Sequence, residues 1–242
     1  MDFTEIRKIS IESIVSGNEG CGVLSNLNWR RYERQLGEVS KHIPKNSKIL
    51  DIGCGRGMTT AMIKKIIPSS EVIGIDLQKF SSWDIYQEHN DVKYFIGDAT
   101  DLKFKNEEFD VIVSFGVIEH VTSDQKFIKE NLRVLKKEGV GFILNIPNRY
   151  SINEFLAQKI GIWSHEIKYN KSEIEALLKS NGIKMFAIKR RFLIPAQVCR
   201  VNNLLGKSFD KLYMQLDFLD KLICKSPLKL FSQTFDVFYK NF

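Results

Sequence analysis

The stretch "ILDIGCGRG", residues 49–57, decides the fold of this 242-residue chain. Its apolar start, "KILDI" at 48–52, predicts a short buried strand, and residues 58–67 predict a helix that Pro68 ends. Between them, three glycines alternate with Cys54 and Arg56. A glycine turn that joins a strand to a helix exposes backbone N–H groups and lets a ligand approach closely. We therefore expect a ligand site at this turn.

The spacing of the glycines argues against two common nucleotide sites. Dinucleotide turns follow G-x-G-x-x-G and P-loops end in Gly-Lys-Ser/Thr, whereas Asp51 to Gly57 follow D-x-G-x-G-x-G. A carboxylate at Asp51 would repel a pyrophosphate. It would attract a ligand that carries sulfonium and ammonium groups by about 4 kcal/mol at a surface-like dielectric. Taken alone, Asp51 has a second interpretation as a cap of the following helix.

The chain alternates strands and helices on both sides of this turn. The further predicted strands are residues 71–76, 92–98, 109–115, 141–147, 183–189 and 233–240, and further helices are predicted at 28–43, 123–137 and from Asn170 or Ser172 to Gly182. Strands joined by helices favour right-handed parallel crossovers. We predict an α/β fold with a doubly wound, mostly parallel seven-stranded sheet, helices on both faces and an antiparallel last strand.

One domain accounts for this length. We divide it into an N-terminal helical arm (1–46), a ligand-binding core (47–191), a helical insertion (192–229) and the final strand (230–242). The insertion has apolar residues at steps of four and three, which predicts one stripe along a helix: Leu205, Phe209, Leu212, Leu216, Leu219 and Ile223. Lysines flank this stripe at Lys207, Lys211, Lys221, Lys225 and Lys229. Three roles are open for it: a roof over the site, a homodimer contact, or a helix on an anionic membrane.

Two further acids occupy the ends of predicted strands. Asp76 ends "VIGID", where a carboxylate can accept from both ribose hydroxyls, and Asp98 follows the next strand in "IGDAT", where it can accept from an adenine amino group. Either could alone be a turn residue. Together with Asp51 they place three acids along one sheet edge.

With these motifs the chain resembles the class I S-adenosylmethionine-dependent methyltransferases, in the broad branch that includes quinone-biosynthesis and many small-molecule enzymes. The residues that carry the resemblance lie between Lys48 and Arg190 and include "FDVIVSFGVIEHV" and "YNKSEIEALLKSNGI". The resemblance implies S-adenosyl-L-methionine as cofactor and S-adenosyl-L-homocysteine as product. It implies that the methionine part of the cofactor is held by Asp51, Gly53, Gly55 and Gly57, and the ribose by Asp76. It implies that the adenine is held by Asp98 and Ala99, with Leu77 packed on the adenine face. It further implies that Ser114 and Phe115 line the methyl-donor side.

Methyl transfer is a displacement in which alignment supplies much of the rate, and a hydroxyl acceptor also profits from a base. His120 in "IEHV" and His165 in "WSHE" are the candidate bases, although either could be a structural or surface residue. No spacing of acids or histidines calls for a metal, so we expect none. The expected acceptor is a small molecule or a glycan- or lipid-linked intermediate, methylated at oxygen. The alternative is a catalytically silent cofactor-binding module.

Composition limits the partners and the compartment. The net charge of +7 is spread along the chain, with its densest spot at "IKRR", residues 188–191, so nucleic acid is not the expected partner. The four cysteines lack close pairing or zinc spacing, which fits a reducing compartment. The N-terminus lacks the apolar core of a signal peptide. We expect a cytoplasmic protein, with peripheral membrane contact through 192–229 as the open variant.

Overall fold

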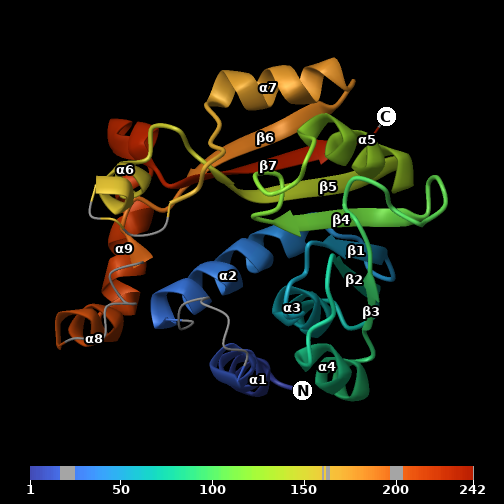
Figure 1. The fold of residues 1–242 in the computed structure, drawn as a ribbon, viewed down its shortest axis with the longest axis horizontal. Coiled ribbons are helices and arrows are strands. Elements are labelled where there is room, and N and C mark those ends of the chain that lie inside the picture. The colour runs from blue at the N-terminus through green and yellow to red at the C-terminus, as the bar shows by residue number, and fades with distance from the viewer. Residues whose placement is uncertain (17–24, 160, 162–163, 197–203, 242) are drawn as a thin grey trace.

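A computed structural model describes residues 1–16, 25–159, 161, 164–196 and 204–241 (Figure 1). Its seven strands form one sheet of order β3-β2-β1-β4-β5-β7-β6. The strands are β1 (Lys48–Ile52), β2 (Glu71–Asp76), β3 (Lys93–Ile96), β4 (Phe109–Phe115), β5 (Leu135–Pro147), β6 (Lys184–Arg191) and β7 (Thr234–Lys240). β7 runs antiparallel to both of its neighbours, and neighbouring strands among β1 to β5 pair in parallel. The predicted sheet, including its antiparallel last strand, is confirmed.

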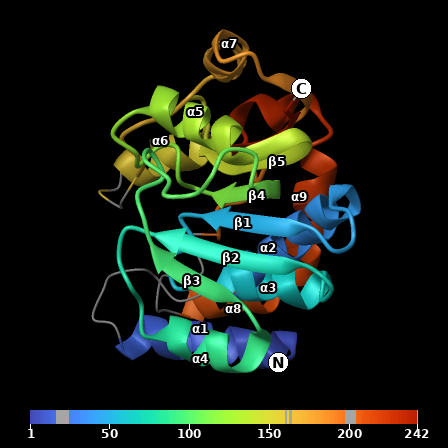
Figure 2. The same cartoon turned by 90° about the vertical axis from the view of Figure 1, so that its right-hand side faces the viewer.

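Helices cover both faces of the sheet (Figures 1 and 2). The helices are α1 (Phe3–Ser16), α2 (Asn26–Val39), α3 (Met58–Ile66), α4 (Ser82–Asn90), α5 (Asp124–Val134), α6 (Ile152–Lys159), α7 (Lys171–Ser180), α8 (Leu204–Lys211) and α9 (Tyr213–Ile223), with 3-10 turns η1 (Ser40–His42) and η3 (Pro227–Phe231). One apolar core joins the sheet to α5 and α7, and a second joins it to α1 to α4. The carboxyl ends of β1, β2 and β4 are thereby held rigidly between two packed layers.

The start of β5 differs most from the prediction. The helix expected over 123–137 ends at Val134, and β5 begins at Leu135 instead of residue 141. Leu135 pairs with Phe109 at the start of β4. The strand pairing therefore overrides the helical periodicity that includes Leu135, because both candidate structures place this residue in the same core.

The insertion also departs from the prediction of one continuous stripe. It forms two helices, α8 and α9, that meet at Leu212. Phe209 and Leu216 pack against a small core that includes Leu27 of α2, but Leu212 and Leu219 are exposed. The side chain of Leu205 falls outside the described part of the chain.

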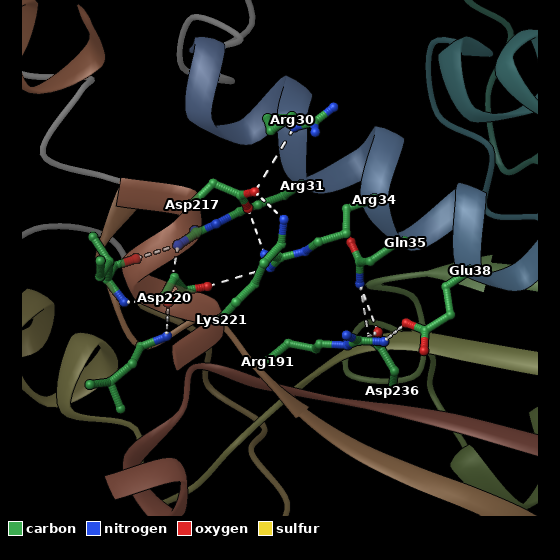
Figure 3. Close-up of polar contacts among 12 residues, drawn as sticks. Arg30, Arg31, Arg34, Gln35, Glu38, Arg191, Asp217, Asp220, Lys221 and Asp236 are labelled. Carbon is green, nitrogen blue, oxygen red and sulfur yellow. Dashed lines mark hydrogen bonds and ion pairs between the residues drawn. The ribbon is translucent and has the colours of Figure 1, made fainter. Parts of the chain in front are cut away.

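Ion pairs between α9 and α2 attach the insertion to the N-terminal arm (Figure 3). Arg34 contacts Asp217 at 2.6 Å and Asp220 at 3.4 Å, and the buried Arg31 lies 4.0 Å from Asp220. Burial lowers the pKa of Arg31 to about 10, although the nearby aspartates oppose the shift. A backbone segment joins the same network, since Leu193 N–H donates to Asp220 Oδ1.

Candidate active site

Three carboxylates follow the carboxyl ends of three neighbouring strands. Asp51 lies in β1, Asp76 ends β2, and Asp98 follows β3 after one glycine. The register pairs Asp51 with Gly74, and Asp76 with Ile96 of β3, so the three acids follow one edge of the sheet. No ion pair involves any of the three among the described residues. We name this group, Asp51, Asp76 and Asp98, the acidic rim.

Asp51 is the buried member of the acidic rim. Its side chain accepts hydrogen bonds at Oδ2 from the hydroxyls of Thr59 (2.6 Å) and Thr60 (2.7 Å) at the start of α3. Its Oδ1 is buried and has no hydrogen-bond partner in the part of the chain that the structure describes. Burial raises the pKa of Asp51 to about 6, against the effect of the two threonines, and Asp76 adds to the rise. Such a carboxylate is ready for a cationic partner, because its described hydrogen-bond partners are hydroxyls and none of them carries a positive charge.

The glycine turn bends around this carboxylate with positive φ angles at Gly53 (67°), Gly55 (51°) and Gly57 (86°). A Cβ at Gly53 would lie 2.4 Å from Val117, and one at Gly57 would lie 2.8 Å from the ring of Tyr94. A Cβ at Gly55 would meet no atom within 4 Å. The outer two glycines are therefore required by packing, whereas the middle one faces open space that a ligand could fill.

The other rim residues are more accessible. Asp76 holds the turn, since Gly55 N–H donates to its Oδ2 at 2.8 Å. The exposed Asp98 accepts at Oδ1 from the backbone N–H and the hydroxyl of Thr100, and these bonds lower its pKa. Next to them, Leu77 is 72% exposed and Ala99 is buried. An exposed leucine beside two acids offers an apolar surface for a ring.

The end of β4 borders the turn. Phe115 packs against Tyr32 of α2 with 5.6 Å between ring centroids, so the N-terminal arm lies over this strand end. Ser114 is fully buried, and its Oγ has no hydrogen-bond partner among the described residues. Phe115 is thus placed at the edge of the site, whereas Ser114 lies beneath its surface.

These features fit a cationic adenosyl cofactor. The orphaned oxygen of Asp51 and the open space at Gly55 are the two observations that such a ligand would explain. Asp76 and Asp98 lie where hydroxyl and amino donors could be received. A pyrophosphate would instead meet the three carboxylates of the acidic rim.

A histidine and carboxylate cluster lies beyond β4. His165 Nδ1 lies 3.0 Å from Glu154 Oε1, and its backbone N–H donates to Glu154 Oε2 at 2.9 Å. These contacts outweigh the burial of Glu154 and lower its pKa. His165 Nε2 and His120 Nε2 lie 3.8 Å and 4.0 Å from Oε1 of the buried Glu119. The fold therefore brings the two predicted histidines together, with ring centroids 6.1 Å apart.

Burial dominates the protonation of this cluster. It raises the pKa of Glu119 to about 7, although the nearby His165 opposes the rise. Burial and His165 together lower the pKa of the half-exposed His120. Glu119 Oε2 is buried without a hydrogen-bond partner in the described ranges. The cluster can thus exchange protons near neutral pH.

The same cluster is a candidate metal group. Glu119, His120 and His165 each offer one ligand atom, and these atoms lie within 4.8 Å of one another. Sequence spacing could not predict this grouping of three ligand atoms, since His165 lies 45 residues beyond His120. The expectation that no metal is used stays a prediction. Glu154 was also missed, because its partner lies across the segment after α6.

No helix within the described ranges is both long and apolar enough to cross a membrane.

Comparison with known proteins connects this geometry to a family. Residues 50–143 match the model of a methyltransferase domain. A ubiquinone biosynthesis O-methyltransferase of Rickettsia typhi is 31% identical over 69% of this chain and 73% of its own length. A similar enzyme of Pelagibacter ubique is 36% identical over 42% of the chain, and a probable S-adenosylmethionine-dependent methyltransferase of Mycolicibacterium smegmatis is 26% identical over 68%. The chain spans 43% and 62% of the lengths of these last two relatives.

Solved structures agree on the fold. A SAM-dependent methyltransferase of Thermotoga maritima superposes with a TM-score of 0.59 at 19% identity, over 87% of this chain and 88% of its own. A geranyl diphosphate C-methyltransferase of Streptomyces coelicolor, solved with S-adenosyl-L-homocysteine, gives a TM-score of 0.61 at 15% identity, over 88% of this chain and 81% of its own. From its sequence relatives and its fold, this chain belongs to the class I S-adenosylmethionine-dependent methyltransferases.

Proposed function

We propose that this chain transfers a methyl group from S-adenosyl-L-methionine to a hydroxyl oxygen of a small-molecule or glycan- or lipid-linked acceptor, by direct displacement. The observation that carries the oxygen target is the contact between His165 and Glu154. A carboxylate at Nδ1 fixes the ring and increases the basicity of Nε2, as a base for a hydroxyl requires. The names of the Rickettsia and Pelagibacter relatives, both O-methyltransferases, support the same choice.

The acidic rim would hold the cofactor. In this proposal Asp51 and the turn of Gly53, Gly55 and Gly57 receive the methionine part, with the free Oδ1 of Asp51 facing its positive charge. Asp76 would accept from the ribose, and Asp98 with the backbone of Ala99 from the adenine, while Leu77 packs on the adenine face. Phe115 would border the methyl group, and the buried Ser114 would support it from below. The bound cofactor supplies an electrophilic methyl group on a sulfonium.

The protein's own part in the reaction is alignment and proton removal. The turn after β1 packs directly on the segment after β4, since a Cβ at Gly53 would overlap Val117. This contact fixes the distance between the cofactor turn and the segment that carries Glu119 and His120. In the proposal His165 takes the hydroxyl proton as the bond to the methyl carbon forms, and Glu154 stabilises the resulting imidazolium. Glu119 Oε1 lies 3.8 Å from His165 Nε2, where its charge would also stabilise the imidazolium.

The test is transfer of labelled methyl from the cofactor to a fractionated cell extract, followed by mass spectrometry of the product. A labelled methyl ether or ester would support the proposal, and label on nitrogen or carbon would contradict the oxygen target. Tight cofactor binding without transfer to any fraction would favour the silent module. A chelator arm separates two uses of the cluster: activity lost with EDTA and restored by a divalent cation would assign Glu119, His120 and His165 to a metal.

A further inference from the structure

Helix α9 has the inverse polarity of an ordinary surface helix. Its acidic residues, Asp217 and Asp220, are buried against α2, where they pair with Arg34 and the neighbouring arginines (Figure 3). Its opposite side exposes large apolar residues that are 47–63% accessible: Met214, Phe218, Leu219 and Leu222. A helix that packs for stability alone would place these groups the other way round.

The exposed apolar surface continues beyond α9. The 3-10 turn η3 exposes Leu228, Leu230 and Phe231. Arg190 at the end of β6 connects to it, since its Nη1 donates to the carbonyl of Leu230 at 3.0 Å. We call the seven side chains of α9 and η3 the apolar face: Met214, Phe218, Leu219, Leu222, Leu228, Leu230 and Phe231. A concentration of exposed apolar side chains such as this one indicates an interaction site.

The charges around the apolar face have one sign. Lysines at 207, 211, 221, 225 and 229 are exposed. The carboxylates within 204–231 are Asp210, Asp217 and Asp220. Asp210 accepts from Asn26 and Asp220 from Leu193 and Ile194, while Asp217 pairs with Arg34 and, within α9, with Lys221. The modest net charge of the segment therefore hides four exposed lysines, at 207, 211, 225 and 229, that form no ion pair with a described residue.

A basic hollow lies on the side of α9 that faces α2. It has a volume of about 390 Å³ and lies between α2, the end of β6 and α9. Lys41, Arg190 and Lys225 line it, and none of the three forms an ion pair with a described residue. Its acids, Glu38 and Asp220, are already paired with Arg191 and with Arg34. The hollow can therefore receive an anionic group between α2 and α9.

We propose that the apolar face and its lysines dock on an anionic lipid membrane. Charge complementarity selects this occupant. A helix that lies in the interface buries apolar side chains at the acyl boundary and directs lysines to headgroups, and each lysine near an anionic surface contributes about fivefold in binding. The proposal does not depend on the methyl acceptor, because vesicle binding is measured without turnover.

The experiment is flotation of the full chain with vesicles of phosphatidylcholine alone or mixed with phosphatidylglycerol, at physiological salt. We expect binding to the anionic vesicles only. The variant K211Q/K225Q/K229Q should bind about a hundredfold more weakly, since three lysines contribute about fivefold each. F218Q/L222Q should bind at least tenfold more weakly. The matched controls, K45Q/K137Q/K179Q and I85Q, change exposed residues outside the insertion and should bind as the parent does.

All variants should keep the parent melting temperature and affinity for S-adenosyl-L-homocysteine, because the changed side chains are exposed. Failure of the parent to float with anionic vesicles overturns the proposal, and so does equal binding by the parent and the face variants. A concentration-dependent dimer that F218Q/L222Q dissociates, without vesicle binding, would assign the apolar face to a second copy instead.

Discussion

Replacing Asp51 by Asn should make the ligand-free protein more stable and the cofactor site inactive. Asn keeps the size of the side chain and an oxygen that can accept from Thr59 and Thr60, but it removes a buried charge with no ionic partner among the described residues. The pKa of Asp51 rises from 3.8 to about 6 on folding. At 1.36 kcal/mol per pH unit, the ionised carboxylate costs about 3 kcal/mol at pH 8.

The upward shift in the pKa of Asp51 decides how the stability of the protein changes with pH. A folded-state pKa above the unfolded value adds stability at low pH, and that stability is lost as the pH rises through about 6. The parent should therefore weaken between about pH 4 and 6 relative to D51N. Urea unfolding of both at pH 4, 6 and 8 measures this. The free energies of unfolding should be close at pH 4 and differ by about 3 kcal/mol, in favour of D51N, at pH 8.

Calorimetry with S-adenosyl-L-methionine tests the predicted loss of cofactor binding in D51N. Removing one partner of a buried ion pair costs about 3–5 kcal/mol, so D51N should bind at least a hundredfold more weakly. The parent itself should lose affinity as the pH falls below about 6, because the cation favours the ionised Asp51. The control D101N removes an exposed acid outside the rim and should change neither quantity. A D51N protein that is less stable at pH 8, or that binds the cofactor as the parent does, refutes the reasoning.

Three further changes test other parts of the account. G55A should fold with a loss of about 1 kcal/mol, from a non-glycine residue at positive φ, yet lose cofactor affinity in calorimetry, because its methyl group enters the ligand space; unchanged affinity would move the ligand elsewhere. H165Q should lower kcat by about 10²–10⁴ and leave cofactor affinity unchanged, whereas H120Q should have the smaller effect because its ring is more exposed; equal effects would argue against a base at His165. D220A should lower the free energy of unfolding in urea by about 3–5 kcal/mol, because Arg31 stays buried without this partner, whereas E175A, from an exposed pair, should lower it by less than about 1 kcal/mol. Equal losses would show that the α2–α9 ion pairs do not stabilise the fold in this way.

The sheet and its acidic edge could be predicted because local signals decide them. The apolar runs of β1, β2 and β4 are continuous and end at an acid or a glycine, so their limits were predicted to the residue. The acids then follow from the rule that parallel strands bring their carboxyl ends to one edge. The start of β5 was wrong, because pairing with β4 decided it.

The polarity of α9 could not be predicted, since its cause lies far away in the sequence. Apolar periodicity in the insertion favoured an inward stripe that included Leu219. The structure buries Asp217 and Asp220 instead, because arginines of α2, more than 180 positions earlier, face them. The contact of Glu154 with His165 escaped prediction for the same reason, as a loop and not a periodic element brings them together.

The central claim is that the acidic rim receives a positively charged adenosyl donor. A crystal structure of the protein with S-adenosyl-L-methionine tests it most directly. The account predicts the donor's charged end at Gly55 and the free oxygen of Asp51, with its ribose at Asp76. A rim left empty at saturating donor, or the donor bound elsewhere on the molecule, would contradict it.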